Sequence, residues 1–96
     1  MDILVAYDVS TETAAGRRRL RHVANVCLAF GQRVQKSVFE CSLSPEQFER
    51  LEHRLLKIIK AEEDSLRIYR MLEPRERHLR AYGRQSDIDF HAPLIG

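Results

Sequence analysis

The order of the hydrophobic patterns constrains the fold of this chain more than any other feature. Residues 3–7 form a short apolar run with strand character, and from about Thr13 to Phe30 the apolar residues recur every three to four positions, which predicts a helix. Gly31 is a common stop after such a helix. Strand, helix and strand patterns follow. The order predicts an α+β fold of the ferredoxin-like type, β-α-β-β-α-β, with one sheet and both helices on one of its faces.

The second helix has a well-defined predicted start. Ser44 is a good N-cap, Pro45 suits the first helical position, and Gln47 completes a capping box. The apolar stripe that follows predicts a helix that continues to about residue 62.

The strands after the first are less regular. In residues 33–43 the alternation changes phase near Ser37, which indicates a bend, a bulge or two short strands. Residues 65–72 alternate as a strand that Pro74 ends, since proline cannot donate to a ladder. Residues 79–83 predict a weak fifth strand.

Length and composition indicate one domain. A chain of 96 residues with 44% hydrophobic and 31% charged residues can build one core with little margin, so dimerisation would help it. We expect residues 1–83 to form the domain and residues 84–96 to form a tail of the same domain that packs against a partner subunit. No apolar stretch approaches the roughly 20 residues that span a bilayer, and no signal peptide is evident, so we expect a cytoplasmic protein without a membrane partner.

Cysteines and histidines do not predict a metal site. Cys27 and Cys41 lie at apolar positions without close spacing, so we expect reduced core cysteines. The histidines are scattered without ligand spacing, and we expect no general base among His22, His53, His78 and His91.

Asp8 is the candidate for chemistry. It is a lone carboxylate at the end of the first strand, directly before a polar turn that contains Ser10 and Thr11. An acid at this position can also accept hydrogen bonds from backbone N–H groups of the turn, or cap the helix that follows. The residues alone leave both roles open.

Basic residues gather after Asp8. Residues 10–36 contain six basic residues and one acidic residue, Glu12. Four arginines stand near the start of the first helix, where positive charge opposes the helix dipole, so helix stability does not explain their number and phosphate binding does. At 100° per residue two of them lie on one flank of the apolar face, one lies on the other flank and one points to solvent, where a solvated helix face is an equal alternative. They are, in that order, Arg17 and Arg21, Arg19, and Arg18.

Four sequence features occur together along residues 1–83. They are Tyr7-Asp8-Val9 after an apolar strand, the arginine-rich helix start, the string Gly-Gln-Arg-Val-Gln-Lys-Ser-Val-Phe-Glu-Cys at residues 31–41, and the strand Leu-Arg-Ile-Tyr at residues 66–69. In combination they resemble the small CRISPR-associated endoribonuclease family, the smaller of the two universal CRISPR adaptation proteins.

The resemblance implies a homodimer whose two Asp8 residues face each other across the two-fold axis, with the C-terminal strand of each subunit added to the partner's sheet. It implies a Mg²⁺- or Mn²⁺-dependent endonuclease in which Asp8 is the catalytic and metal-binding residue, one ion being shared by the pair. It also implies nucleic-acid binding by Arg33 and by arginines of the helix start, and accessory roles for Tyr7 and Phe39. Core packing is the more common role of these two rings.

Three functions remain open after the resemblance is taken into account. The first is a metal-dependent endonuclease that hydrolyses phosphodiesters in single-stranded RNA or double-stranded DNA. The second is a catalytically silent scaffold in CRISPR spacer acquisition that bridges dimers of the larger adaptation integrase and binds spacer DNA. The third is a stand-alone toxin-like ribonuclease. All three predict phosphate-dominated binding without recognition of a base sequence.

Overall fold

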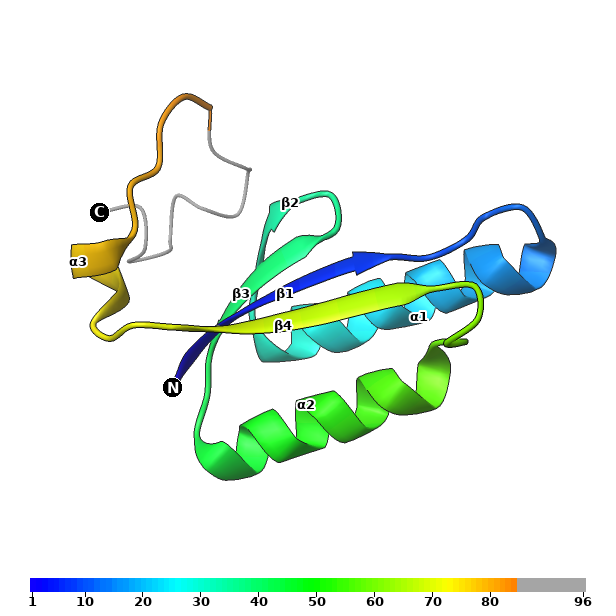
Figure 1. The fold of residues 1–96 in the computed structure, drawn as a ribbon, viewed down its shortest axis with the longest axis horizontal. Coiled ribbons are helices and arrows are strands. Elements are labelled where there is room, and N and C mark those ends of the chain that lie inside the picture. The colour runs from blue at the N-terminus through cyan, green and yellow to red at the C-terminus, as the bar shows by residue number, and fades with distance from the viewer. Residues whose placement is uncertain (85–96) are drawn as a thin grey trace.

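The computed structural model of the chain describes residues 1–84 and has the predicted ferredoxin-like architecture (Figure 1). Four antiparallel strands form one sheet in the order β2-β3-β1-β4, and α1 and α2 lie side by side over one of its faces. None of the helices within residues 1–84 has the length and apolar character of a membrane span. The elements are β1 (Asp2–Asp8), α1 (Ala14–Phe30), β2 (Gln32–Gln35), β3 (Val38–Ser42), α2 (Pro45–Ile58), β4 (Ser65–Met71) and α3 (Arg75–His78).

The core lies between the sheet and the two long helices. In β1 the odd-numbered side chains are buried against the helices, while Leu4, Ala6 and Asp8 share the opposite face of the sheet. β1 is hydrogen-bonded to β3 on one side and to β4 on the other, so its backbone is held along its full length. The largest fully buried side chains are Phe39, Ile3, Leu51, Leu55, Val5, Val23, Cys27 and Cys41.

Both long helices begin where the sequence predicts. The Ser44 hydroxyl oxygen accepts a hydrogen bond from the Gln47 N–H at 3.2 Å, and the Gln47 side chain accepts one from the Ser44 N–H at 2.9 Å, which completes the capping box. Thr13 caps α1, because its hydroxyl oxygen accepts a hydrogen bond from the Gly16 N–H at 3.0 Å. These caps satisfy N–H groups that a helix start leaves without an internal partner.

The phase change in the middle of the chain is a hairpin. β2 and β3 pair antiparallel across a turn at Lys36 and Ser37, with an irregular register between Arg33 and Gln35. Of the three alternatives that the sequence left open, the structure has two short strands, and the change of phase marks the turn between them.

One predicted boundary and one predicted strand are wrong. α2 ends at Ile58 and not near residue 62, because the chain turns there and the Lys60 N–H donates a hydrogen bond at 2.8 Å to the carboxylate of Asp64. Residues 79–83 form no strand. They follow the short helix α3 as an irregular segment.

The segment that follows α3 lies against the sheet face that the helices leave open. Leu79 and Tyr82 of this segment line a cavity of about 490 Å³ together with Leu4, Val38 and Glu40 of the sheet. This segment and the open face of the sheet thus border one cavity. The predicted dimerisation tail lies, except for Arg84, outside the described residues.

Candidate functional site

Asp8 ends β1 with its carboxylate exposed. It pairs with Ser65 of β4, and by alternation it lies on the sheet face opposite the helices. Among residues 1–84 no side chain or backbone group forms a hydrogen bond or ion pair with the Asp8 carboxylate. Its backbone is therefore fixed by the sheet, while its carboxylate is available to a ligand or to a second chain.

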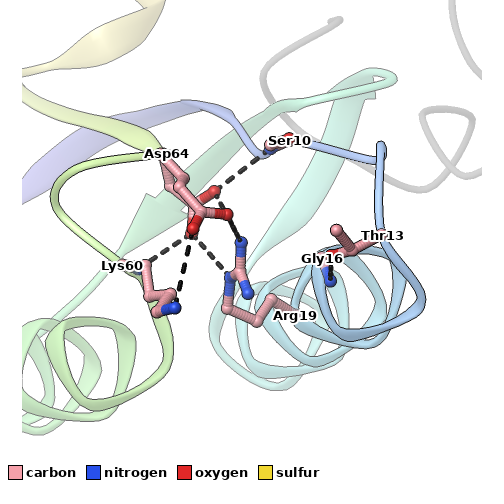
Figure 2. Close-up of polar contacts among 7 residues, drawn as sticks. Ser10, Thr13, Gly16, Arg19, Lys60 and Asp64 are labelled. Carbon is pink, nitrogen blue, oxygen red and sulfur yellow. Dashed lines mark hydrogen bonds and ion pairs between the residues drawn. The ribbon is translucent and has the colours of Figure 1, made fainter.

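The turn after Asp8 is held by a different acid, Asp64. The Ser10 N–H donates a hydrogen bond at 3.1 Å to Oδ1 of Asp64, at the start of β4 (Figure 2). A hydrogen bond to this turn was the alternative role considered for Asp8, and in the structure it belongs to Asp64. Asp8 is left free of that structural task.

Asp64 is a buried carboxylate with several donors around it. Oδ2 accepts hydrogen bonds at 2.8 Å from Arg19 Nε and from the Lys60 N–H, and Oδ1 accepts one at 3.3 Å from Arg19 Nη2 in addition to the bond from Ser10. The Asp64 side chain is 0% exposed. The Arg19 guanidinium and the two backbone N–H groups lower the pKa of Asp64 from 3.8 to about 2, against the opposing effect of burial.

The Arg19 guanidinium is bound by carboxylates of the same chain. In addition to its bonds to Asp64, its Nη2 donates to Oε1 of Glu63 at 3.0 Å, and the Arg19 side chain is only 12% exposed. The bond to Asp64 is also the main reason why the pKa of Arg19 is raised. A phosphate would have to displace two carboxylates to reach this guanidinium, so we leave Arg19 out of the nucleic-acid surface proposed below.

The other arginines of α1 point outward. Arg17, Arg18 and Arg21 are exposed, and Arg17 Nη1 donates a hydrogen bond at 3.0 Å to the Thr11 carbonyl oxygen. The start of α1, the loop after β1 and the loop between α2 and β4 lie at the same end of the molecule (Figure 1). The structure thus brings three exposed guanidinium groups to the end of the sheet that carries Asp8.

Tyr7, Phe39 and Arg33 form a packed cluster on the helix side of the sheet. The two rings are stacked with their centroids 6.2 Å apart and their planes at 21°, and the Arg33 guanidinium carbon lies 5.1 Å from the centroid of the Phe39 ring. Phe39 is 0% exposed and Tyr7 is 6% exposed, so both rings pack in the core. Burial raises the pKa of Tyr7, while a hydrogen bond from Arg33 acts in the opposite direction. The cluster supports β1 directly behind Asp8.

Asp8 is the candidate metal ligand within residues 1–84. No three His, Cys, Asp or Glu side chains in residues 1–84 are grouped as ligands. Mg²⁺ commonly takes one or two carboxylates, several waters and substrate phosphate oxygens, and an exposed carboxylate without a partner in residues 1–84 is a suitable oxygen donor. One chain offers a single carboxylate at this position, so the shared ion expected from the sequence would need the Asp8 of a second chain as well.

The cysteines lie in the core, as predicted. Cys27 and Cys41 are free and buried, and burial raises their pKa values to about 12 and about 11. Burial keeps both thiols protonated at neutral pH and away from solvent, which is typical of unreactive core cysteines.

Comparison with known proteins places the chain in a family. The sequence profile of the family described as CRISPR associated protein Cas2 matches residues 1–78. The chain belongs to the Cas2 family. It is 61% identical over 95 residues to the CRISPR-associated endoribonuclease Cas2 1 of Moorella thermoacetica, with 99% of each chain covered. It is 43% identical over 95 residues to the CRISPR-associated endonuclease Cas2 of Halalkalibacterium halodurans, also with 99% of each covered.

A solved Cas2 structure shares the fold. The crystal structure of Streptococcus pyogenes Cas2 matches this chain with a TM-score of 0.76 at 52% sequence identity, covering 86% of this chain and 100% of that one. Membership in the Cas2 family confirms the resemblance drawn from the residues, and the S. pyogenes structure confirms the ferredoxin-like fold.

The contact between Arg19 and Asp64 is the part of the site that the sequence did not predict. Asp64 is the last of three consecutive acids directly before a predicted strand, which is a weak signal for a residue that anchors a turn. Its partners Ser10 and Arg19 lie 54 and 45 residues away in the sequence, and only the pairing of β1 with β4 brings them together.

Proposed function

We propose that this Cas2 family member is a metal-dependent endonuclease that acts as a homodimer in CRISPR spacer acquisition and hydrolyses phosphodiesters of single-stranded RNA or double-stranded DNA. The placement of Asp8 carries the proposal. Its carboxylate is exposed, has no partner within residues 1–84, and stands on a rigid central strand at the end of the molecule where α1 presents its arginines. The names of the M. thermoacetica and H. halodurans relatives support a nuclease.

A second copy of the chain would supply the second carboxylate. Leu4, Ala6 and Asp8 lie on the sheet face that α1 and α2 do not cover. Two such faces stacked about a two-fold axis would bring the two Asp8 residues to the same seam. Mg²⁺ or Mn²⁺ held between them would polarise the scissile phosphate and lower the pKa of a bound water.

The remaining residues of the site bind and orient the substrate. Arg17, Arg18 and Arg21 offer exposed guanidinium groups that pair with backbone phosphates and offset negative charge that develops during hydrolysis. Arg33 lies on the helix side of the sheet, because its guanidinium group packs over the Phe39 ring and its side chain is only partly exposed. Binding through phosphates predicts little dependence on base sequence.

The test of the nuclease is Asp8→Asn. We expect this variant to lose cleavage of RNA and duplex DNA in Mg²⁺ or Mn²⁺ while its dimer stays intact by light scattering. Asp2→Asn, at the other end of the same strand, is the matched control and should cleave at the wild-type rate. Cleavage that persists in Asp8→Asn would contradict the proposal.

The second candidate is a catalytically silent scaffold that bridges the larger adaptation integrase and binds spacer DNA. It is favoured by the lack of a three-residue ligand cluster within residues 1–84, which leaves Asp8 as a lone acid at the proposed site. On this hypothesis Asp8→Asn supports spacer acquisition in cells at the wild-type level. Reversal of Arg17, Arg18 and Arg21 to Glu, or deletion of residues 84–96, abolishes it.

A further inference from the structure

The carboxylate of Asp64 joins segments that meet next to Asp8. It accepts hydrogen bonds from the loop after β1 at Ser10, from α1 at Arg19 and from the end of α2 at Lys60 (Figure 2). The residue after it, Ser65, is the β4 partner of Asp8. One side chain therefore fixes both the loop that leaves Asp8 and the strand that pairs with it.

This arrangement has little freedom. A buried carboxylate is costly unless all its lone pairs are used, and each oxygen of Asp64 accepts two hydrogen bonds. Without Arg19 the carboxylate would lose its charged partner, and without Asp64 the guanidinium of Arg19 would keep only Glu63. Each residue of the pair therefore holds the other in place.

The loop between β1 and α1 is held at further points. A Cβ at Gly16 would overlap the Ser10 carbonyl oxygen, which shows that α1 packs directly on the loop. Thr13 accepts from the Gly16 N–H, and Arg17 donates to the Thr11 carbonyl. These contacts hold the loop at its helix end, and the hydrogen bond from Ser10 to Asp64 holds it where it leaves β1.

Resting on the nuclease function proposed above, we propose that Asp64 and Arg19 are positioning residues of the Asp8 site. They fix the backbone at Ser10 and so the direction in which the Asp8 carboxylate is presented, and neither of them contacts the substrate. Arg19 thereby differs from the exposed arginines of the same helix, whose role is phosphate binding. Both carboxylate oxygens of Asp64 are occupied by hydrogen bonds, so Asp64 could bind a metal or act as a general base only by breaking them.

The kinetic test compares Asp64→Asn with the wild type in cleavage of duplex DNA. A misplacement of about 1 Å costs on the order of 100-fold in rate, so we expect kcat to fall about 10- to 100-fold. KM for DNA should stay within about twofold, because the exposed arginines are unchanged. Glu62→Gln, an exposed acid two residues away, is the matched control and keeps wild-type kcat. Wild-type kcat in a folded Asp64→Asn would overturn the proposal.

Arg19 is tested by the salt dependence of binding. If Arg19→Gln removes a positioning residue, the slope of log Kd against log salt for duplex DNA is unchanged, whereas Arg18→Gln lowers its magnitude by roughly 0.9 for the phosphate lost. A decrease of that size in Arg19→Gln would show direct contact with phosphate and overturn the proposal. Arg19→Lys keeps the charge with fewer donors, and its kcat should lie between those of Arg19→Gln and the wild type.

A third measurement is independent of cleavage. Amide hydrogen exchange at Ser10 should accelerate in Asp64→Asn and stay unchanged in Glu62→Gln, with the protection of the core strands maintained. If the wild type itself does not cleave, the nuclease proposal fails, and exchange at Ser10 still decides whether Asp64 holds the loop. Unchanged protection of Ser10 in Asp64→Asn would overturn the positioning role in either case.

Discussion

Removal of the Asp64 charge should make the stability of this protein less dependent on pH. The folded chain lowers the pKa of Asp64 from 3.8 to about 2, chiefly through the hydrogen bonds from Arg19. Because the carboxylate is ionised more readily in the folded state than in the unfolded one, this contribution to stability is fully present above about pH 4. It is lost as the pH falls through about 2, where the folded form also takes up a proton.

The size of the effect follows from the pKa change. One pKa unit corresponds to about 1.4 kcal/mol, so a change from 3.8 to about 2 gives an upper limit of about 2.4 kcal/mol. Glu63, the other partner of Arg19, is partly exposed. Solvent therefore screens the charges at this edge of the cluster and reduces the contribution of the Asp64 charge to the free energy of unfolding. We therefore expect Asp64→Asn to lower the free energy of unfolding at pH 7 by about 1–2 kcal/mol through loss of the charge, in addition to any packing cost.

The assay is urea unfolding followed by circular dichroism at fixed protein concentration, for wild type, Asp64→Asn and Glu62→Gln. The difference in unfolding free energy between wild type and Asp64→Asn should be constant from pH 7 to about pH 4.5 and shrink between about pH 4 and pH 2. The Glu62→Gln control should show no such decrease over this range. A difference between wild type and Asp64→Asn that stays constant down to pH 2 would refute the reasoning about the charge.

Further predictions concern the surroundings of the site. Asp8→Asn should change the free energy of unfolding by less than about 0.5 kcal/mol in urea titrations, because within residues 1–84 no group forms a hydrogen bond or ion pair with the Asp8 carboxylate; a larger loss would show a structural role. Gly16→Ala should cost about 1–3 kcal/mol in the same assay, since the methyl group meets the Ser10 carbonyl oxygen; wild-type stability would contradict the close packing of α1 on the loop. Cys27 and Cys41 should react with a thiol reagent at pH 8 only in urea, and rapid reaction of the native protein would contradict their burial.

The parts of the fold that were predicted correctly depend on neighbours in the sequence. The capping box of α2 needs only Ser44, Pro45 and Gln47, and all of its partners lie within four residues of one another. The end of α2 was predicted four residues too late, because apolar periodicity continues past Ile58 while the hydrogen bond between Lys60 and the Asp64 carboxylate turns the chain. A local pattern cannot represent that contact, since the same carboxylate also has partners in β1 and α1.

The arginines of α1 show the same limit within one helix. The helical wheel separated Arg19 from Arg17 and Arg21, and in the structure Arg19 does lie on a different side of α1 from the exposed arginines. The partner of Arg19 is Asp64 in the loop between α2 and β4, which lies 45 residues further along the chain. The position of the arginines at the helix start predicts phosphate binding for the group, with a solvated face as an equal alternative for Arg18, although Arg19 has carboxylate partners inside the chain.

Two acids at one end of the sheet have opposite environments, and this difference bears on function. Asp64 is buried and carries the structural task of anchoring the turn, so its removal should affect stability and the geometry of the site together. Asp8 is exposed and, within residues 1–84, has no partner whose loss would explain a defect. Loss of cleavage in Asp8→Asn with unchanged stability would therefore be a chemical defect, as the endonuclease predicts. Asp64→Asn, which should lose stability as well, is the variant to compare it with. The scaffold instead predicts that Asp8→Asn keeps its function.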